Sequence, residues 1–114
     1  MDYPEHYQHI AKLIETLGSD APPMMAAFSR LHGVTVRDGV LSGKVKELIA
    51  LAIGINVRCD GCVAYHVHDA VAAGASREEV LETIGVAIMM GGGPSVIYGA
   101  EALEALDQFE PPAP

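Results

Sequence analysis

Residues 58–70, with the sequence RCDGCVAYHVHDA, hold both cysteines of the chain and two of its five histidines. Cys59 and Cys62 form a Cys-x-x-Cys pair, and His66 follows four residues later. Three kinds of chemistry use these residue types at short spacing: metal binding, a structural disulfide, and electron exchange through a dithiol. The spacing of these residues helps to distinguish the three.

The spacing favours the dithiol. On a helix, Cys59, Cys62 and His66 lie on one face, where the imidazole can take a thiol proton and leave the reactive thiolate. If Asp60 caps that helix, Cys62 lies in its first turn, where the positive end of the helix dipole also lowers the pKa of a thiol. The second cysteine can then resolve the adduct that the first one forms.

The other two interpretations fit less well. A zinc site needs four ligands, but there is no second cysteine pair, and His66 and His68 would point about 200° apart on a helix. A disulfide across so short a loop constrains little of the unfolded chain. The segment before the cysteines reads as a helix, which also disfavours a thioredoxin-like βαβ scaffold.

The elements that carry these residues are predicted to be helices, because the apolar residues recur at helical spacing and no strand alternation is convincing. In the third helix, Val45, Leu48, Ile49, Ala52 and Ile53 form the predicted apolar stripe. Ser76 and Glu79 form a capping box for the fifth. The expected class is an all-α bundle of about six helices, with bounds near residues 3–18, 21–33, 43–56, 59–74, 77–90 and 94–109.

Composition limits the function classes. The 114 residues predict a single domain over 1–114, with residues 110–114 as a frayed tail. Half of the residues are hydrophobic, which is high for so small a monomer and predicts a homo-oligomer. The net charge of −8, without a basic cluster, argues against nucleic-acid binding.

No signal peptide is recognised at the N-terminus, and glycines and a proline at 91–94 interrupt the one long uncharged stretch, residues 83–100. A cytoplasmic protein with no membrane partner is expected.

The GGGPS sequence at 91–95 is interpreted as a tight helix junction rather than a phosphate cradle, since no Walker lysine accompanies it. His32 is interpreted as a helix C-terminal residue and His68 as a surface residue.

From Lys44 into the last predicted helix, about residues 44–108, the sequence resembles the alkylhydroperoxidase D-like, or carboxymuconolactone decarboxylase, family. The resemblance is carried by Glu47, Cys59, Cys62 and His66. As in the thiol-bearing branch of that family, the glutamate lies twelve residues before the first cysteine and the histidine four after the second. The better-characterised peroxidases of the family carry a further histidine immediately before the second cysteine, and this sequence has Gly61 there.

The resemblance implies an all-α fold that assembles as trimers or hexamers and needs no cofactor and no metal. It implies that Cys62 attacks a hydroperoxide, that Cys59 condenses with the resulting sulfenic acid, and that His66 and Glu47 relay the proton. A lipoyl or thioredoxin-type protein would re-reduce the disulfide. Gly61 puts an efficient peroxidase relay in question, and the decarboxylase branch lacks the cysteine pair.

The predicted function is therefore that of a dithiol oxidoreductase with peroxidase-like activity. The main alternative is a non-catalytic oligomeric binding or sensor module whose cysteines report redox state. The third is a decarboxylase-type activity in a pocket of the family's shape.

Overall fold

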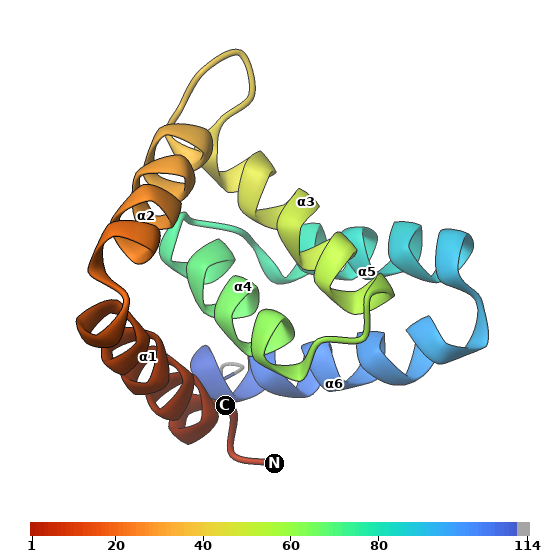
Figure 1. Ribbon diagram of the computed structural model, residues 1–114. Coiled ribbons are helices and arrows are strands. Elements are labelled where there is room, and N and C mark those ends of the chain that lie inside the picture. Colours follow the sequence, from red (N-terminus) through yellow and green to blue (C-terminus); the bar gives the residue numbers. More distant parts are fainter. Residues whose placement is uncertain (112–114) are drawn as a thin grey trace.

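The computed structural model describes residues 1–111 and consists of six helices over that range, with no strand in it (Figure 1). This confirms the predicted all-α class; the predicted tail at 110–114 falls mostly on residues 112–114, which lie outside the described residues. None of the described helices is long and apolar enough to cross a membrane. The helices are α1 (Tyr3–Asp20), α2 (Pro22–Val36), α3 (Gly43–Asn56), α4 (Asp60–Ala72), α5 (Arg77–Gly91) and α6 (Gly93–Phe109).

Helix starts follow the capping signals of the sequence. The Ser42 hydroxyl accepts a hydrogen bond from the Val45 N–H at the start of α3. The predicted capping box at the start of α5 is confirmed: Ser76 accepts the Glu79 N–H, and the Glu79 carboxylate accepts the Ser76 N–H. The hydrogen bond from the Ser76 N–H lowers the pKa of the Glu79 carboxylate, and a weaker contribution in the same direction comes from the hydrogen bond of Lys44.

Two helix ends lie beyond the predicted glycine stops. α1 continues past Gly18 to Asp20, and α2 continues past Gly33 to Val36. A glycine inside a helix costs only about 1 kcal/mol relative to alanine, so it does not end a helix whose next residues still form the helical hydrogen bonds. α2 ends instead at Arg37, which adopts an extended conformation.

The core lies between α3, α4, α5 and α6 (Figure 1). α4 packs against α3 and α6, and α5 packs against the same two helices. α1 contributes only Tyr3 to the buried set, and burial raises the pKa of this phenol to about 12. α2 buries no residue. The buried apolar residues of the central helices are Leu51 and Ile55; Val63, Ala64, Val67 and Ala70; Val80, Ile84 and Ala87; and Ala102, Ala105 and Leu106.

The apolar stripe predicted for α3 is only partly the buried one. Leu48 and Ala52 pack against the core, but Val45, Ile49 and Ile53 are 36, 45 and 58% exposed. The buried residues of α3 are Glu47, Leu51, Gly54 and Ile55. Because α3 is apolar around most of its circumference, its sequence pattern does not single out the face that meets the core.

The glycine-rich segment before α6 forms the tight junction that its sequence predicts. Gly92 has a φ of 72°, a left-handed conformation that favours glycine. Ser95 donates its hydroxyl to Asn56 Oδ1 at 2.5 Å, and a Cβ on Gly91 would overlap both of these side chains. The segment therefore joins α5 and α6 against the C-terminal end of α3.

Glycine at position 99 allows α6 to pack closely on α5. A Cβ at Gly99 would lie 2.7 Å from Ile84 Cγ2, and Ile84 is only 7% exposed. We expect Gly99→Ala to lower the free energy of unfolding by about 1–3 kcal/mol, because a branched core side chain would have to move. The measurement is denaturant unfolding followed by circular dichroism.

Gly85 provides the matched control on α5. It is exposed and has no atom within 4 Å of its would-be Cβ. We expect Gly85→Ala to raise stability by about 0.5–1 kcal/mol through helix propensity alone. Equal changes in the free energy of unfolding for Gly99→Ala and Gly85→Ala would show that the α5–α6 contact does not require glycine at position 99.

Candidate functional site

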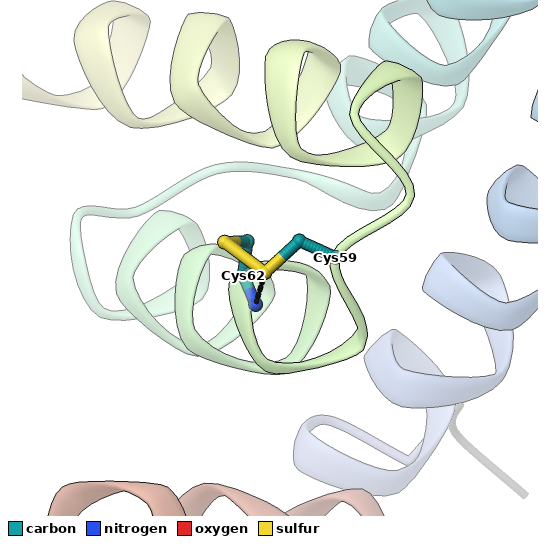
Figure 2. The surroundings of a disulfide bond; sticks show 2 residues. All are labelled: Cys59 and Cys62. Atoms are coloured by element: carbon teal, nitrogen blue, oxygen red, sulfur yellow. Dashed lines mark hydrogen bonds between the residues drawn. A yellow bond between two sulfur atoms is a disulfide. The ribbon is translucent and has the colours of Figure 1, made fainter.

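The two cysteines lie where the chain passes from α3 into α4, and they form a disulfide (Figure 2). Cys59 is the N-cap of α4 and Cys62 lies in its first turn, with their Cα atoms 5.1 Å apart. Asp60, predicted to be the cap, is instead the first helical residue. The connection from α3 is so short that Arg58 takes a left-handed conformation with a φ of 59°.

Close packing of α3 on this turn fixes the position of the sulfurs. The Cys59 N–H donates to the Gly54 carbonyl at 3.2 Å. A Cβ on Gly54 would lie only 3.2 Å from the Cβ of Cys62. Glycine at this position of α3 therefore lets the helix approach the cysteine turn closely.

The sulfur of Cys59 also acts as a helix cap. The Cys62 backbone N–H donates to Cys59 Sγ at 3.1 Å, the hydrogen bond drawn in Figure 2. A sulfur that accepts an amide hydrogen bond at the positive end of a helix is stabilised in its anionic form. The Cys59 sulfur therefore satisfies one of the free N–H groups in the first turn of α4.

A carboxylate–imidazole pair joins α3 to α4 one turn further along. His66 Nδ1 lies 3.1 Å from Glu47 Oε2, and Glu47 is only 6% exposed. A buried carboxylate needs such a partner, because burying an unpaired charge is costly. With Nδ1 held by Glu47, the other ring nitrogen of His66, Nε2, is the one available to a reacting group.

The cysteines and His66 open onto one cavity of about 440 Å³. The structure thus places all four residues of the predicted site at one α3–α4 contact, with Glu47 behind His66. Most of the remaining cavity wall is apolar and comes from α1, α2 and α4. The lining residues besides Cys59, Cys62 and His66 are Ile10, Ile14, Met25, Phe28, Ser29, His32, Gly61 and Tyr65.

Three side chains near the site were missed or interpreted differently from the sequence. His32, interpreted as a helix C-terminal residue, is followed by another turn of α2 and lines the cavity. His68, predicted to be a surface residue, stacks on Tyr7 of α1 at 4.0 Å between ring centroids and bonds to Asp69 Oδ1 at 2.9 Å. The spacing of Cys62, His66 and Asp69, with steps of four and three residues, was the available signal for Asp69.

Comparison with known proteins gives one consistent result. Residues 22–105 match the carboxymuconolactone decarboxylase family, so the match begins at α2, before the region from residue 44 that carries the resemblance in the sequence. The crystal structure of a carboxymuconolactone decarboxylase family protein from Legionella pneumophila superposes with a TM-score of 0.91 at 41% identity, covering 94% of this chain and 96% of that one.

Two curated relatives are also similar over most of their length. An uncharacterized protein from Cupriavidus necator is 40% identical over 91 residues, which is 80% of each chain. An uncharacterized protein from Haemophilus influenzae is 38% identical over 104 residues, 91% of this chain and 92% of its own.

The capping role of Cys59 has a measurable consequence for stability. In a background with Cys62→Ser, so that no disulfide forms, we expect Cys59→Ala to lower the free energy of unfolding by about 1 kcal/mol, because an N-cap acceptor is lost. Cys59→Ser in the same background is the control, since its hydroxyl can still accept the amide hydrogen bond. Chemical denaturation under reducing conditions measures both, and equal stabilities would contradict the cap.

Proposed function

The chain belongs to the carboxymuconolactone decarboxylase family, and on that premise we propose that it is a dithiol oxidoreductase that reduces hydroperoxides. The observation that carries the proposal is the Glu47–His66 pair beside the Cys59–Cys62 disulfide, with His66 and both cysteines lining one cavity. This arrangement combines a redox-active sulfur pair with a group that can move a proton.

In the first step His66 takes the thiol proton of Cys62 through Nε2 and leaves a thiolate. The thiolate sulfur attacks the terminal oxygen of the hydroperoxide, the O–O bond breaks, and Cys62 becomes a sulfenic acid. His66 returns its proton to the departing alkoxide, which leaves as an alcohol. Glu47 holds the imidazole by Nδ1 and stabilises the positive charge that His66 carries between the two transfers.

In the second step the Cys59 thiolate attacks the sulfenic sulfur of Cys62. The sulfur–sulfur bond forms as the S–O bond breaks, and the hydroxide that leaves takes up from solvent the equivalent of the proton that Cys59 lost on becoming a thiolate, giving water. The hydrogen bond from the Cys62 N–H to Cys59 Sγ supports this role, because it stabilises the attacking thiolate. Two electrons have then passed from the cysteine pair to the peroxide.

The lining of the cavity supports an apolar organic hydroperoxide as substrate. Ile10, Ile14, Met25 and Phe28 line the cavity with the sulfurs, so an alkyl or aryl group would be sheltered from water there. An external dithiol must return the two electrons, and a lipoyl or thioredoxin-type protein has the required chemistry. The exchange begins by thiolate attack on one of the two disulfide sulfurs.

The test is stopped-flow oxidation of the reduced protein by one equivalent of cumene hydroperoxide, with EDTA present. We expect the wild type to lose both thiols quickly and Cys62→Ser to lose this reaction. His66→Ala and Glu47→Gln should each slow it by about 10-fold or more, the usual scale for losing a proton-transfer partner.

His9→Ala is the matched control, because His9 is an exposed histidine of α1 that does not line the cavity. Its rate should equal that of the wild type. Slow thiol loss that is unchanged by the His66 and Glu47 substitutions would contradict the proposal and favour a redox-sensing module without turnover.

We also propose that the protein works as a homo-oligomer. α2 buries no residue within the chain, and its apolar side chains Met24, Phe28 and Leu31 are 56, 58 and 61% exposed. The apolar row of Val45, Ile49 and Ile53 on α3, continued by the C-cap residue Val57, is exposed as well. A second copy of the chain that covers these rows would remove the apolar surface from water.

Charge placed in the α3 row should weaken that assembly. We expect Ile53→Glu to shift the protein to smaller species in sedimentation velocity, because a carboxylate would be buried at the subunit contact. Gln8→Glu adds the same charge at an exposed polar residue of α1 and serves as the control. A monomeric wild type, or an Ile53→Glu assembly equal to the wild type, would contradict this interface.

A further inference from the structure

Beside the dithiol site, three potential metal ligands from three different helices come together. His32 of α2, Glu47 of α3 and Asp69 of α4 each offer one ligand atom, and these atoms all lie within 4.8 Å of one another. Glu47 is buried and Asp69 is half-buried. The cluster therefore depends on the packing of three helices and is not a group of neighbours along one helix.

The separations suit a bound ion better than direct contacts. In the described part of the chain, His32 forms no hydrogen bond or ion pair with either carboxylate. The centre of a triangle with 4.8 Å sides lies about 2.8 Å from each corner. Small side-chain movements would bring the three atoms to the 2.0–2.2 Å at which Zn²⁺ takes imidazole nitrogen and carboxylate oxygen.

The cluster contains two carboxylates, and their present side-chain partners are the imidazoles of His66 and His68. No lysine or arginine among residues 1–111 pairs with either of them. The nearest lysine in sequence, Lys44, is paired with Glu79 at 2.9 Å. A divalent ion between Glu47 and Asp69 would offset their mutual repulsion and the cost of burying them.

Both carboxylates are held from outside by a histidine. His66 Nδ1 lies 3.1 Å from Glu47 Oε2, and His68 Nδ1 lies 2.9 Å from Asp69 Oδ1. His68 is in turn stacked on Tyr7. Outer-shell hydrogen bonds of this kind orient the carboxylates of known metal sites.

We propose that His32, Glu47 and Asp69 bind a divalent first-row metal ion of the Zn²⁺ class. One imidazole and two carboxylates are suitable ligands for such an ion, and their two negative charges match its charge. Three protein ligands leave a coordination position for water. The site does not use the sulfurs, and so it differs from a zinc site in the cysteine motif.

The test is metal binding by the oxidised protein, in which the disulfide leaves no thiolate to compete for the ion. Isothermal titration with Zn²⁺ should give one ion per protomer. Co²⁺ should give a visible d–d spectrum without a thiolate charge-transfer band, and Zn²⁺ should raise the Tm, as expected for a ligand of the folded state.

The variants identify the ligands. We expect His32→Ala and Asp69→Asn each to weaken Zn²⁺ binding by about 10-fold or more, the scale seen even for outer-shell partners. His9→Ala is the matched control and should bind as the wild type does, and circular dichroism checks that each variant is folded. No stoichiometric binding, or binding unaffected by the His32 and Asp69 variants, would overturn the proposal.

Both proposals use Glu47, but their tests are separate. The thiol oxidation assay contains EDTA, and the binding assay uses protein that has no free thiol. A protein that reduces hydroperoxide but binds no metal would overturn the metal site alone. A protein that binds Zn²⁺ through His32 and Asp69 but oxidises slowly would overturn the oxidoreductase alone.

Discussion

The candidate site depends on one buried carboxylate. Glu47 is 6% exposed on the core-facing side of α3, and its hydrogen bond to His66 joins α3 to α4. A charge in this position would destabilise the bundle without a partner, and the partner is the histidine to which the proposed dithiol chemistry assigns the proton transfer. The same contact therefore satisfies the fold and orients the imidazole. The core-facing side of α3 is therefore not wholly apolar, because one of its buried positions is occupied by Glu47.

The dithiol is positioned by backbone geometry rather than by a side-chain network. Cys59 caps α4, and Gly54 lets α3 approach the cysteine turn closely. The two sulfurs consequently differ in environment. Cys59 Sγ accepts an amide hydrogen bond, whereas Cys62 lies one helical turn from His66. This difference supports the proposed division of roles, in which Cys62 meets the peroxide and Cys59 resolves the product.

Local signals in the sequence predict most of the helices, and long-range packing explains what they miss. The serine caps of α3 and α5, the glycine junction at 91–95 and the single face of Cys59, Cys62 and His66 all depend on residues close in sequence. The position of His32 beside Glu47 and Asp69 depends instead on how α2 packs, which no local pattern encodes. The exposed row of α3 cannot be told from a core-facing row for a related reason: an apolar residue looks the same in a sequence whether it is buried in the core or exposed.

Gly61 stands where the better-characterised peroxidases of the family carry a histidine, and it bears on the shape of the cavity. A Cβ at this position would lie 3.5 Å from Ile10 Cδ1, so the side chain of α1 packs directly over the glycine. A larger imidazole would have to displace Ile10 or turn into the cavity. The departure from the family pattern therefore comes with an apolar wall in place of a second proton donor beside the sulfurs. It leaves His66 as the one imidazole at helical spacing from Cys62, and the apolar lining is consistent with the proposed apolar hydroperoxide as substrate.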